Sequence, residues 1–206
     1  TNFDWWRKRF KRQFELVDLL RLDHFRGLAG YWRVNGNSKT AISGKWINSP
    51  GRTLLNKLKI DLGTDFLPII AEDLGVITPD VEKLRKNFEL PGMKILQFAF
   101  DGNEDNPYLP KNIEGENWVV YTGTHDNSTS ISWWECLEDN FKKQIKDEYK
   151  LSGDPSWCLI KMGIKTKANK SSPKRVLAQR YDLVRSLWDR DIKVIRRICR
   201  YASATF

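Results

Sequence analysis

The 206-residue sequence has few of the residues that build metal centres and disulfide frameworks. It contains two histidines, His24 and His125, and neither lies in an H-x-H or H-E-x-x-H spacing. Its three cysteines, Cys136, Cys158 and Cys199, are odd in number, far apart and outside any zinc-binding or redox spacing. We therefore expect reduced thiols rather than a disulfide-stapled secreted domain or a structural zinc site.

Long apolar runs are also missing. No stretch approaches the roughly 18 apolar residues that indicate a membrane span. The first residues, TNFDWWRKRF, contain neither a starting Met nor the apolar core of a signal peptide. We therefore expect a chain whose upstream part is absent, a cytoplasmic location and no membrane partner. Hydrophobic residues make up 40% of the chain and charged residues 30%, which is ordinary for a soluble domain with one substantial core.

The net charge of +9 is concentrated near the end of the chain. Residues 161–200 contain 13 Lys or Arg and 3 Asp or Glu, whereas the rest contains 22 basic and 23 acidic residues. A basic surface that favours nucleic acid is therefore restricted to the tail. We expect no nucleic-acid partner for the body of the protein.

Short apolar runs alternate with helical patterns along the chain. The runs predict buried strands within residues 16–23, 67–75, 93–101 and 118–127. The spacing of apolar residues predicts helices over residues 4–16, 52–60, 78–88 and 131–150, and the segment 30–66 is otherwise rich in loop residues. This order predicts an α/β fold with parallel strands. Because a complete (β/α)8 TIM barrel needs about 250 residues, we expect its later strands only, in a partial barrel.

Acidic residues follow three of these strands. Asp23, Glu72 and Asp126 each come directly after or near the end of an apolar run. The carboxyl ends of barrel strands form the active-site rim, so we expect the three carboxylates to converge there. Arg21 lies two residues before Asp23, on the same side of a strand, and can hold that carboxylate ionised as a nucleophile requires. Glu72 has no basic neighbour in the sequence and is the better candidate for an acid that stays protonated.

This combination is the one that retaining glycoside chemistry uses. The chemistry needs one ionised and one protonated carboxyl group about 5 Å apart. A third carboxylate, at Asp126, can bind sugar hydroxyls more tightly in the transition state than in the ground state.

Taken singly, each signal also has a structural interpretation. Asp23 can form an ion pair with Arg21 or Arg26, and the Glu72–Asp73 pair can be an exposed turn. The HDN segment at 125–127 can be a capping turn. The large aromatic residues are expected to pack in the core rather than on sugar, namely Trp5, Trp6, Phe98, Trp133 and Trp134.

Four segments resemble one enzyme family. They are RLDHFRGL (21–28), AEDLGVITPDVEKLR (71–85), LPGMKILQFAFD (90–101) and YTGTHDN (121–127). These segments resemble the amylomaltases, the 4-α-glucanotransferases or disproportionating enzymes of glycoside hydrolase family 77 in the α-amylase clan. The resemblance implies transfer of an α-1,4-glucan segment to the 4-hydroxyl of an acceptor glucan or glucose, with retention of configuration. It implies α-1,4-glucans and maltooligosaccharides as substrates, and no metal or organic cofactor.

The resemblance also implies a role for each matching residue. Asp23 would be the nucleophile that forms a covalent glycosyl-enzyme, and Glu72 would be the general acid and then the base. Asp126 would stabilise the transition state. The residues expected to contact sugar rings are Arg21, His24 and His125 at the attacked glucose and, at neighbouring sugars, Asp73 and Phe98.

The resemblance covers residues 5–169 and leaves a basic tail. We expect residues 1–169 to be the C-terminal part of the catalytic barrel and residues 170–206 to depart from the family, through a shifted reading frame or a truncation. Alternatively the tail is a genuine basic amphipathic helix. Such a helix would have on one face Leu177, Tyr181, Val184, Trp188, Ile195 and Cys199.

Two other functions stay open. One is a non-catalytic or degenerate sugar-binding barrel. The other is a metal-dependent TIM-barrel hydrolase in which His24, His125 and the carboxylates are ligands. We also expect residues 1–206 alone to be inactive, because an incomplete barrel has unpaired edge strands.

Overall fold

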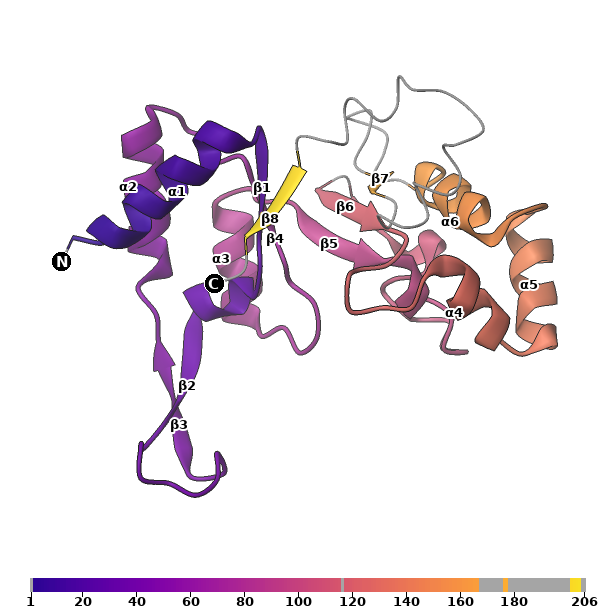
Figure 1. The fold of residues 1–206 in the computed structure, drawn as a ribbon, viewed down its shortest axis with the longest axis horizontal. Helices are drawn as coiled ribbons and strands as arrows, with labels where there is room; N and C mark the ends of the chain where they lie inside the picture. The colour runs from indigo at the N-terminus through magenta and orange to yellow at the C-terminus, as the bar shows by residue number, and fades with distance from the viewer. Residues whose placement is uncertain (1, 116, 167–175, 178–200, 205–206) are drawn as a thin grey trace. The chain divides into compact units, whose positions relative to one another are not determined.

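The computed structural model describes residues 2–115, 117–166, 176–177 and 201–204 (Figure 1). Its contacts divide the chain into two compact units. The first comprises Thr1–Gly92 with Arg200–Phe206, and the second comprises Met93–Cys199. Each unit combines a small sheet containing parallel strands with helices, so the predicted α/β class is confirmed. Within the described residues, no helix has the length and apolar character needed to cross a membrane.

The first unit is built on a parallel sheet in the order β4 (Ile69–Ala71), β1 (Leu19–Leu22) and β8 (Tyr201–Ala204). Its helical elements are α1 (Asp4–Leu16), the 3-10 turn η1 (Phe25–Leu28), α2 (Gly51–Leu62) and α3 (Pro79–Asn87). The predicted helices at 4–16, 52–60 and 78–88 are confirmed. The strands predicted at 16–23 and 67–75 are present but shorter.

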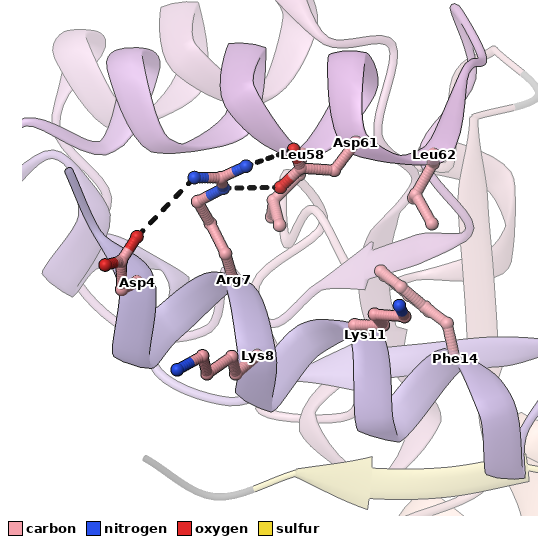
Figure 2. Close-up of a pocket in the computed structure, with 8 residues that line it drawn as sticks. All are labelled: Asp4, Arg7, Lys8, Lys11, Phe14, Leu58, Asp61 and Leu62. Carbon is pink, nitrogen blue, oxygen red and sulfur yellow. Dashed lines mark hydrogen bonds and ion pairs between the residues drawn. The ribbon is translucent and has the colours of Figure 1, made fainter.

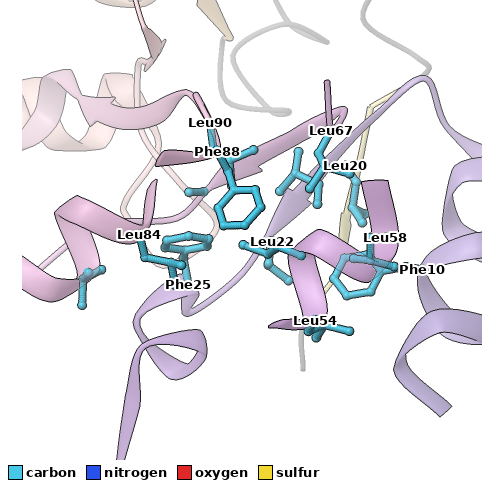
Figure 3. Close-up of a cluster of buried hydrophobic side chains, with 14 residues drawn as sticks. Phe10, Leu20, Leu22, Phe25, Leu54, Leu58, Leu67, Leu84, Phe88 and Leu90 are labelled. Carbon is cyan, nitrogen blue, oxygen red and sulfur yellow. The ribbon is translucent and has the colours of Figure 1, made fainter. Parts of the chain in front are cut away.

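One apolar core holds this unit together (Figure 3). The four-residue repeat on α1 places Phe10 in the core, fully buried, with Trp6 and Phe14 partly buried on either side. Leucines of β1, α2 and α3 belong to the same core cluster. Trp5 does not follow the packing expectation, because 62% of its surface is exposed.

The segment expected to be loop contains an antiparallel hairpin. Strands β2 (Gly30–Val34) and β3 (Gly44–Asn48) pair in a register that sets Trp32 opposite Trp46. Their rings meet edge to face, with centroids 5.6 Å apart. Cross-strand aromatic pairs of this kind stabilise hairpins, so the prediction of loop structure was wrong here.

The second unit has a sheet in the order β5 (Gly92–Ile95), β6 (Trp118–Tyr121) and β7 (Val176–Leu177), with β6 and β7 parallel. The strand predicted over 93–101 ends early, at Ile95, and continues as the 3-10 turn η2 (Leu96–Phe98). Phe98 therefore leaves the strand, and 40% of its surface is exposed instead of lying in the core. The turn is held because the Gln97 N–H donates to the carbonyl oxygen of Thr122, next to β6.

Among the described residues, the second unit also contains three helices and a further 3-10 turn. They are α4 (Ser130–Cys136), α5 (Asp139–Tyr149), α6 (Pro155–Ile164) and the turn η3 (Pro110–Asn112). The single helix predicted over 131–150 was wrong, because the backbone is extended at Leu137 and Glu138. On one straight helix Trp133 and Ile145 would face directions about 120° apart, and the break lets both reach the same core.

Helix α6 was not predicted, although the sequence contains a recognisable signal for its first residues. Asp154 caps it by accepting the N–H groups of Ser156 and Trp157, and Pro155 occupies the first turn. Aspartate before proline is a strong helix-start signal.

The amphipathic helix predicted for the tail falls mostly on residues 178–200, outside the described residues. Leu177 belongs to strand β7, so the helix prediction was wrong at that position.

Candidate active site

The ends of β1 and β4 bring two of the three predicted carboxylates to adjacent strands. The parallel register pairs Leu22 with Ala71, and the next residues are Asp23 and Glu72. The N–H of Glu72 donates to the carbonyl oxygen of Leu22 at 3.0 Å, so the pairing continues into Glu72. Neighbouring strands lie about 4.8 Å apart. The backbone therefore holds Asp23 and Glu72 at the spacing of adjacent strands.

Glu72 is held by main-chain donors. Its Oε2 accepts the N–H of His24 at 2.7 Å, and its Oε1 accepts the N–H of Leu74 at 2.9 Å. Its own carbonyl oxygen accepts the N–H of Phe25 at 3.1 Å. A carboxylate oxygen has two lone pairs, so each oxygen retains acceptor capacity for a ligand. The side chain is half-buried.

Asp23 pairs with Arg21, as the alternation of strand residues predicted. Arg21 Nη2 lies 2.7 Å from Asp23 Oδ1, and the side chain of Arg21 is buried while that of Asp23 is partly exposed. A guanidinium this close is a charge-assisted partner. Arg26, the other candidate partner in the sequence, instead donates to the carbonyl oxygen of Val76 at 2.6 Å.

Asp73, the residue after Glu72, forms an ion pair with helix α3. Its Oδ2 lies 3.1 Å from Arg85 Nε of helix α3, and 7% of its side chain and 4% of that of Arg85 are exposed. Arg85 also donates to the carbonyl oxygen of Leu90. Asp73 thus anchors the segment after Glu72 to α3, and its predicted contact with sugar stays a prediction.

The third carboxylate lies in the second unit, after β6. His125 and Asp126 are exposed, with Nε2 of His125 3.4 Å from Oδ1 of Asp126. The turn that carries them is closed by Asn127, whose Oδ1 accepts the N–H and the hydroxyl of Thr124. Asn127 therefore closes a turn, whereas the residue that caps the following helix α4 is Thr129. The two acidic sites belong to different units.

The turn after β6 is also tied to η2. Gln97 donates from its side chain to the carbonyl oxygen of Ser128 at 3.1 Å. A Cβ on Gly123 would lie 2.9 Å from the Gln97 amide group, so a larger residue here would displace that side chain. Phe98 follows on η2, where its ring meets Tyr108 edge to face at 5.6 Å between centroids.

Arg26 is a residue whose position the sequence analysis did not anticipate. Its guanidinium carbon lies 4.3 Å from the ring centroid of Trp46, on β3, while its Nη1 donates to Val76. It thus connects the hairpin to the segment that follows Glu72. The available signal was an arginine directly after the DHF triplet, but its partners are 20 and 50 residues away along the chain.

A separate hollow lies between α1 and α2 and contains none of the predicted site residues (Figure 2). Arg7 reaches across it and donates two hydrogen bonds to Asp61, with Asp4 nearby. The hydrogen bonds from Arg7 lower the pKa of Asp61 below its ordinary value. The charges that line this hollow are therefore largely used to hold the two helices together.

Metal ligands do not gather in the part of the chain that the structure describes. No group of three or more His, Cys, Asp or Glu side chains that could hold an ion occurs there. The metal-dependent hydrolase alternative has no ligand set among these residues.

Comparison with known proteins supplies a family and relatives. The family model described as 4-alpha-glucanotransferase, of glycoside hydrolase family 77, matches residues 1–187. The match continues past Asn169, where the resemblance was expected to end, and the domain boundary at 169 stays a prediction. A 4-alpha-glucanotransferase of Synechocystis sp. is 53% identical over 146 residues, covering 70% of this chain and 29% of the relative. One of Thermus thermophilus is 41% identical over 175 residues, covering 81% and 35%.

A solved structure is similar as well. The amylomaltase from Streptococcus agalactiae in complex with acarbose matches with a TM-score of 0.75 and 34% identity, over 89% of this chain and 36% of that chain. The chain thus spans about a third of the length of the relatives that it matches.

Proposed function

Because the chain belongs to the 4-α-glucanotransferases of glycoside hydrolase family 77, we propose that its gene product transfers α-1,4-glucan segments to the 4-hydroxyl of a glucan or glucose acceptor. The observation that carries the proposal is the pairing of Asp23 and Glu72 at the ends of adjacent parallel strands. Retaining glycoside chemistry requires two carboxyl groups about 5 Å apart. Adjacent strands hold the main chains of these two residues about 4.8 Å apart, which supports a carboxyl separation of that order.

Asp23 acts as the nucleophile in this proposal. Its oxygen attacks the anomeric carbon while Glu72 gives a proton to the departing glycosidic oxygen, which leaves as the 4-hydroxyl of the released chain. The 4-hydroxyl of the acceptor then gives its proton to Glu72 and attacks the same carbon, which frees Asp23. The ion pair with Arg21 places a positive charge 2.7 Å from the Asp23 carboxylate.

Asp126 stabilises the transition state by binding sugar hydroxyls, and His24 and His125 each contact sugar in the proposal. His125 and Asp126 have side chains exposed enough to accept a ligand. Asp73 and Phe98 contact neighbouring sugars in the proposal. Acarbose bound to the Streptococcus agalactiae relative supports a maltooligosaccharide ligand.

The fold that carries this chemistry is, in our proposal, a (β/α)8 barrel, of which residues 1–169 form a C-terminal part. Parallel pairing of β1 with β4 and of β6 with β7 supports it. The proposed location is cytoplasmic. The rice relative is named as chloroplastic/amyloplastic, so locations differ within the family.

The test is an assay of the complete gene product on maltotriose. We expect glucose and longer maltooligosaccharides, and a fall of at least about 10⁴-fold in Asp23→Asn. Asp65→Asn is the matched control, because Asp65 is exposed and lies outside the site. An Asp23→Asn variant with normal turnover would refute the proposal. Binding of acarbose without any turnover by the unaltered protein would identify a sugar-binding protein instead.

A further inference from the structure

His24 has a backbone conformation that is uncommon for a residue with a side chain. Its φ is 47° and its ψ 50°, in the left-handed region. Histidine enters this region more readily than most residues, but at a cost that glycine does not have. Five non-glycine residues among those described have positive φ, and His24 is the one at the predicted active site.

This conformation directs two successive N–H groups to one residue. The N–H of His24 donates to Oε2 of Glu72 at 2.7 Å, and the N–H of Phe25 donates to the carbonyl oxygen of Glu72 at 3.1 Å. In extended chain, successive residues point to opposite sides. An extended residue at position 24 would therefore direct at most one of these donors toward Glu72.

The contacts on both sides fix this arrangement. Phe25 is fully buried, which holds the following turn, and Leu74 donates to the other oxygen of Glu72. The imidazole of His24 lies beside Gly27, where an added Cβ would be 3.2 Å from Nδ1. The ring and the main chain of His24 thus have separate surroundings, and their contributions can be separated by substitution.

We propose that His24 is a positioning residue that acts through its main chain, because its left-handed backbone holds the Glu72 carboxylate in the orientation that proton transfer requires. This inference rests on the proposed function of Glu72. It differs from the role that the family resemblance implies for His24, which is contact of the side chain with sugar.

The test compares substitutions that accept the left-handed region with one that does not. His24→Gly and His24→Asn both remove the imidazole and tolerate positive φ, whereas His24→Val also removes it but resists that conformation. In the complete gene product we expect kcat on maltotriose to be about 10- to 100-fold lower in His24→Val than in His24→Gly, with His24→Asn close to His24→Gly. KM should differ less than about 3-fold between them, because the donors act on Glu72 rather than on bound sugar.

A second substrate separates proton transfer from a general loss of structure. In α-maltosyl fluoride the C–F bond breaks and fluoride leaves without needing a proton from Glu72. The rate of fluoride release in the first turnover, before Glu72 must take a proton from an acceptor, should therefore differ less than about 5-fold between His24→Val and His24→Gly. Equal activity of Gly, Asn and Val variants on maltotriose would overturn the proposal, as would a Val defect of the same size on both substrates.

His125 provides the matched control, because it is not one of the described non-glycine residues with positive φ. There, the Gly variant should be no more active than the Val variant. A glycine advantage of the same size at His125 would contradict the assignment to backbone conformation at His24.

Amide hydrogen exchange tests the geometry without any activity. The N–H of Leu74 should stay as protected in His24→Gly as in the unaltered protein and exchange at least about 10-fold faster in His24→Val. Equal protection in both variants would overturn the proposal. If the complete gene product does not disproportionate maltotriose, the proposed function fails, and the exchange rates still decide whether His24 positions Glu72.

Discussion

The acidic residues after β1 and β4 and those after β6 follow similar apolar strands but end in different surroundings. Glu72 receives hydrogen bonds from His24 and Leu74, and Asp23 pairs with the buried Arg21. His125 and Asp126 are exposed on a turn that Thr124 and Asn127 close locally. The first site includes a donor from a distant part of the sequence, His24 to Glu72, beside local partners, whereas the acidic side chains of the second lie on a turn closed by near neighbours only.

The difference shows how much can be predicted from an acidic residue at the end of an apolar strand. The sequence indicates that a carboxylate follows a buried strand, and this holds for both sites. One donor to the Glu72 carboxylate, Leu74, lies two residues away, and the other, His24, lies at another strand end 48 residues away. We expect a carboxylate held in this way to be more rigid before substrate arrives than an exposed side chain such as Asp126.

The largest expected effect tests whether the packing of Phe25 stabilises the site that contains Asp23 and Glu72. Phe25 is fully buried, and Phe98 is 40% exposed. We expect Phe25→Ala to lower the free energy of local unfolding by about 3–5 kcal/mol. For Phe98→Ala we expect about 1 kcal/mol, from its edge-to-face contact with Tyr108. Native-state hydrogen exchange of β1 and β5 measures both losses of stability. Equal losses would contradict the claim that packing stabilises the first site more than the second.

A smaller effect distinguishes the carboxylates themselves. Glu72→Gln replaces one acceptor oxygen with an NH₂ group that faces a backbone N–H, so we expect a loss of about 1–3 kcal/mol in local stability. Asp126→Asn removes a charge that is mostly exposed, and we expect a change within about 0.5 kcal/mol. Both variants should lose transfer activity. Exchange of the amides next to each site gives the stability difference, and a destabilising Asp126→Asn would show that the second site is also packed.

Local patterns predicted the elements of the first unit well. The repeat of Trp6, Phe10 and Phe14 predicted helix α1 with the bounds that the structure shows, and Pro79 marked the start of α3. The i and i+2 spacing gave the Arg21–Asp23 pair. Each of these depends on residues within one or two turns, or on strand alternation, which a single sequence displays directly.

Predictions failed where partners distant along the chain decide the structure. The hairpin of β2 and β3 depends on Trp32 meeting Trp46, and the early end of β5 depends on Gln97 reaching Thr122. The ion pair of Asp73 with Arg85 was not predicted either, because the two residues are 12 positions apart. The periodicity of residues within one segment does not indicate such contacts. The orientation of Glu72 could not be predicted for the same reason, because its donor, the N–H of His24, lies on another strand end and has a left-handed backbone.

The smallest expected effect applies the same contrast of distant and local partners to pKa values. The pKa of Asp61 is lowered by hydrogen bonds from Arg7, on another helix, and that of Asp101 by the N–H of Asn103 and then by Asn106 in its own loop. A lowered pKa in the folded state stabilises the protein above the ordinary value of 3.8, and the gain is lost as pH falls through the folded pKa. In Arg7→Met we expect the pKa of Asp61 to rise toward 3.8 and that of Asp101 to stay low.

Carboxyl ¹³C titration follows both aspartates in one sample. The stability difference between Arg7→Met and the unaltered protein should be present at neutral pH and shrink below pH 4, because protonated Asp61 no longer attracts Arg7. Asp101 is the internal control. A shift of Asp101 as large as that of Asp61 would mean that the loop of the second unit also depends on distant contacts, and the contrast between the two regions would then be one of degree rather than of kind.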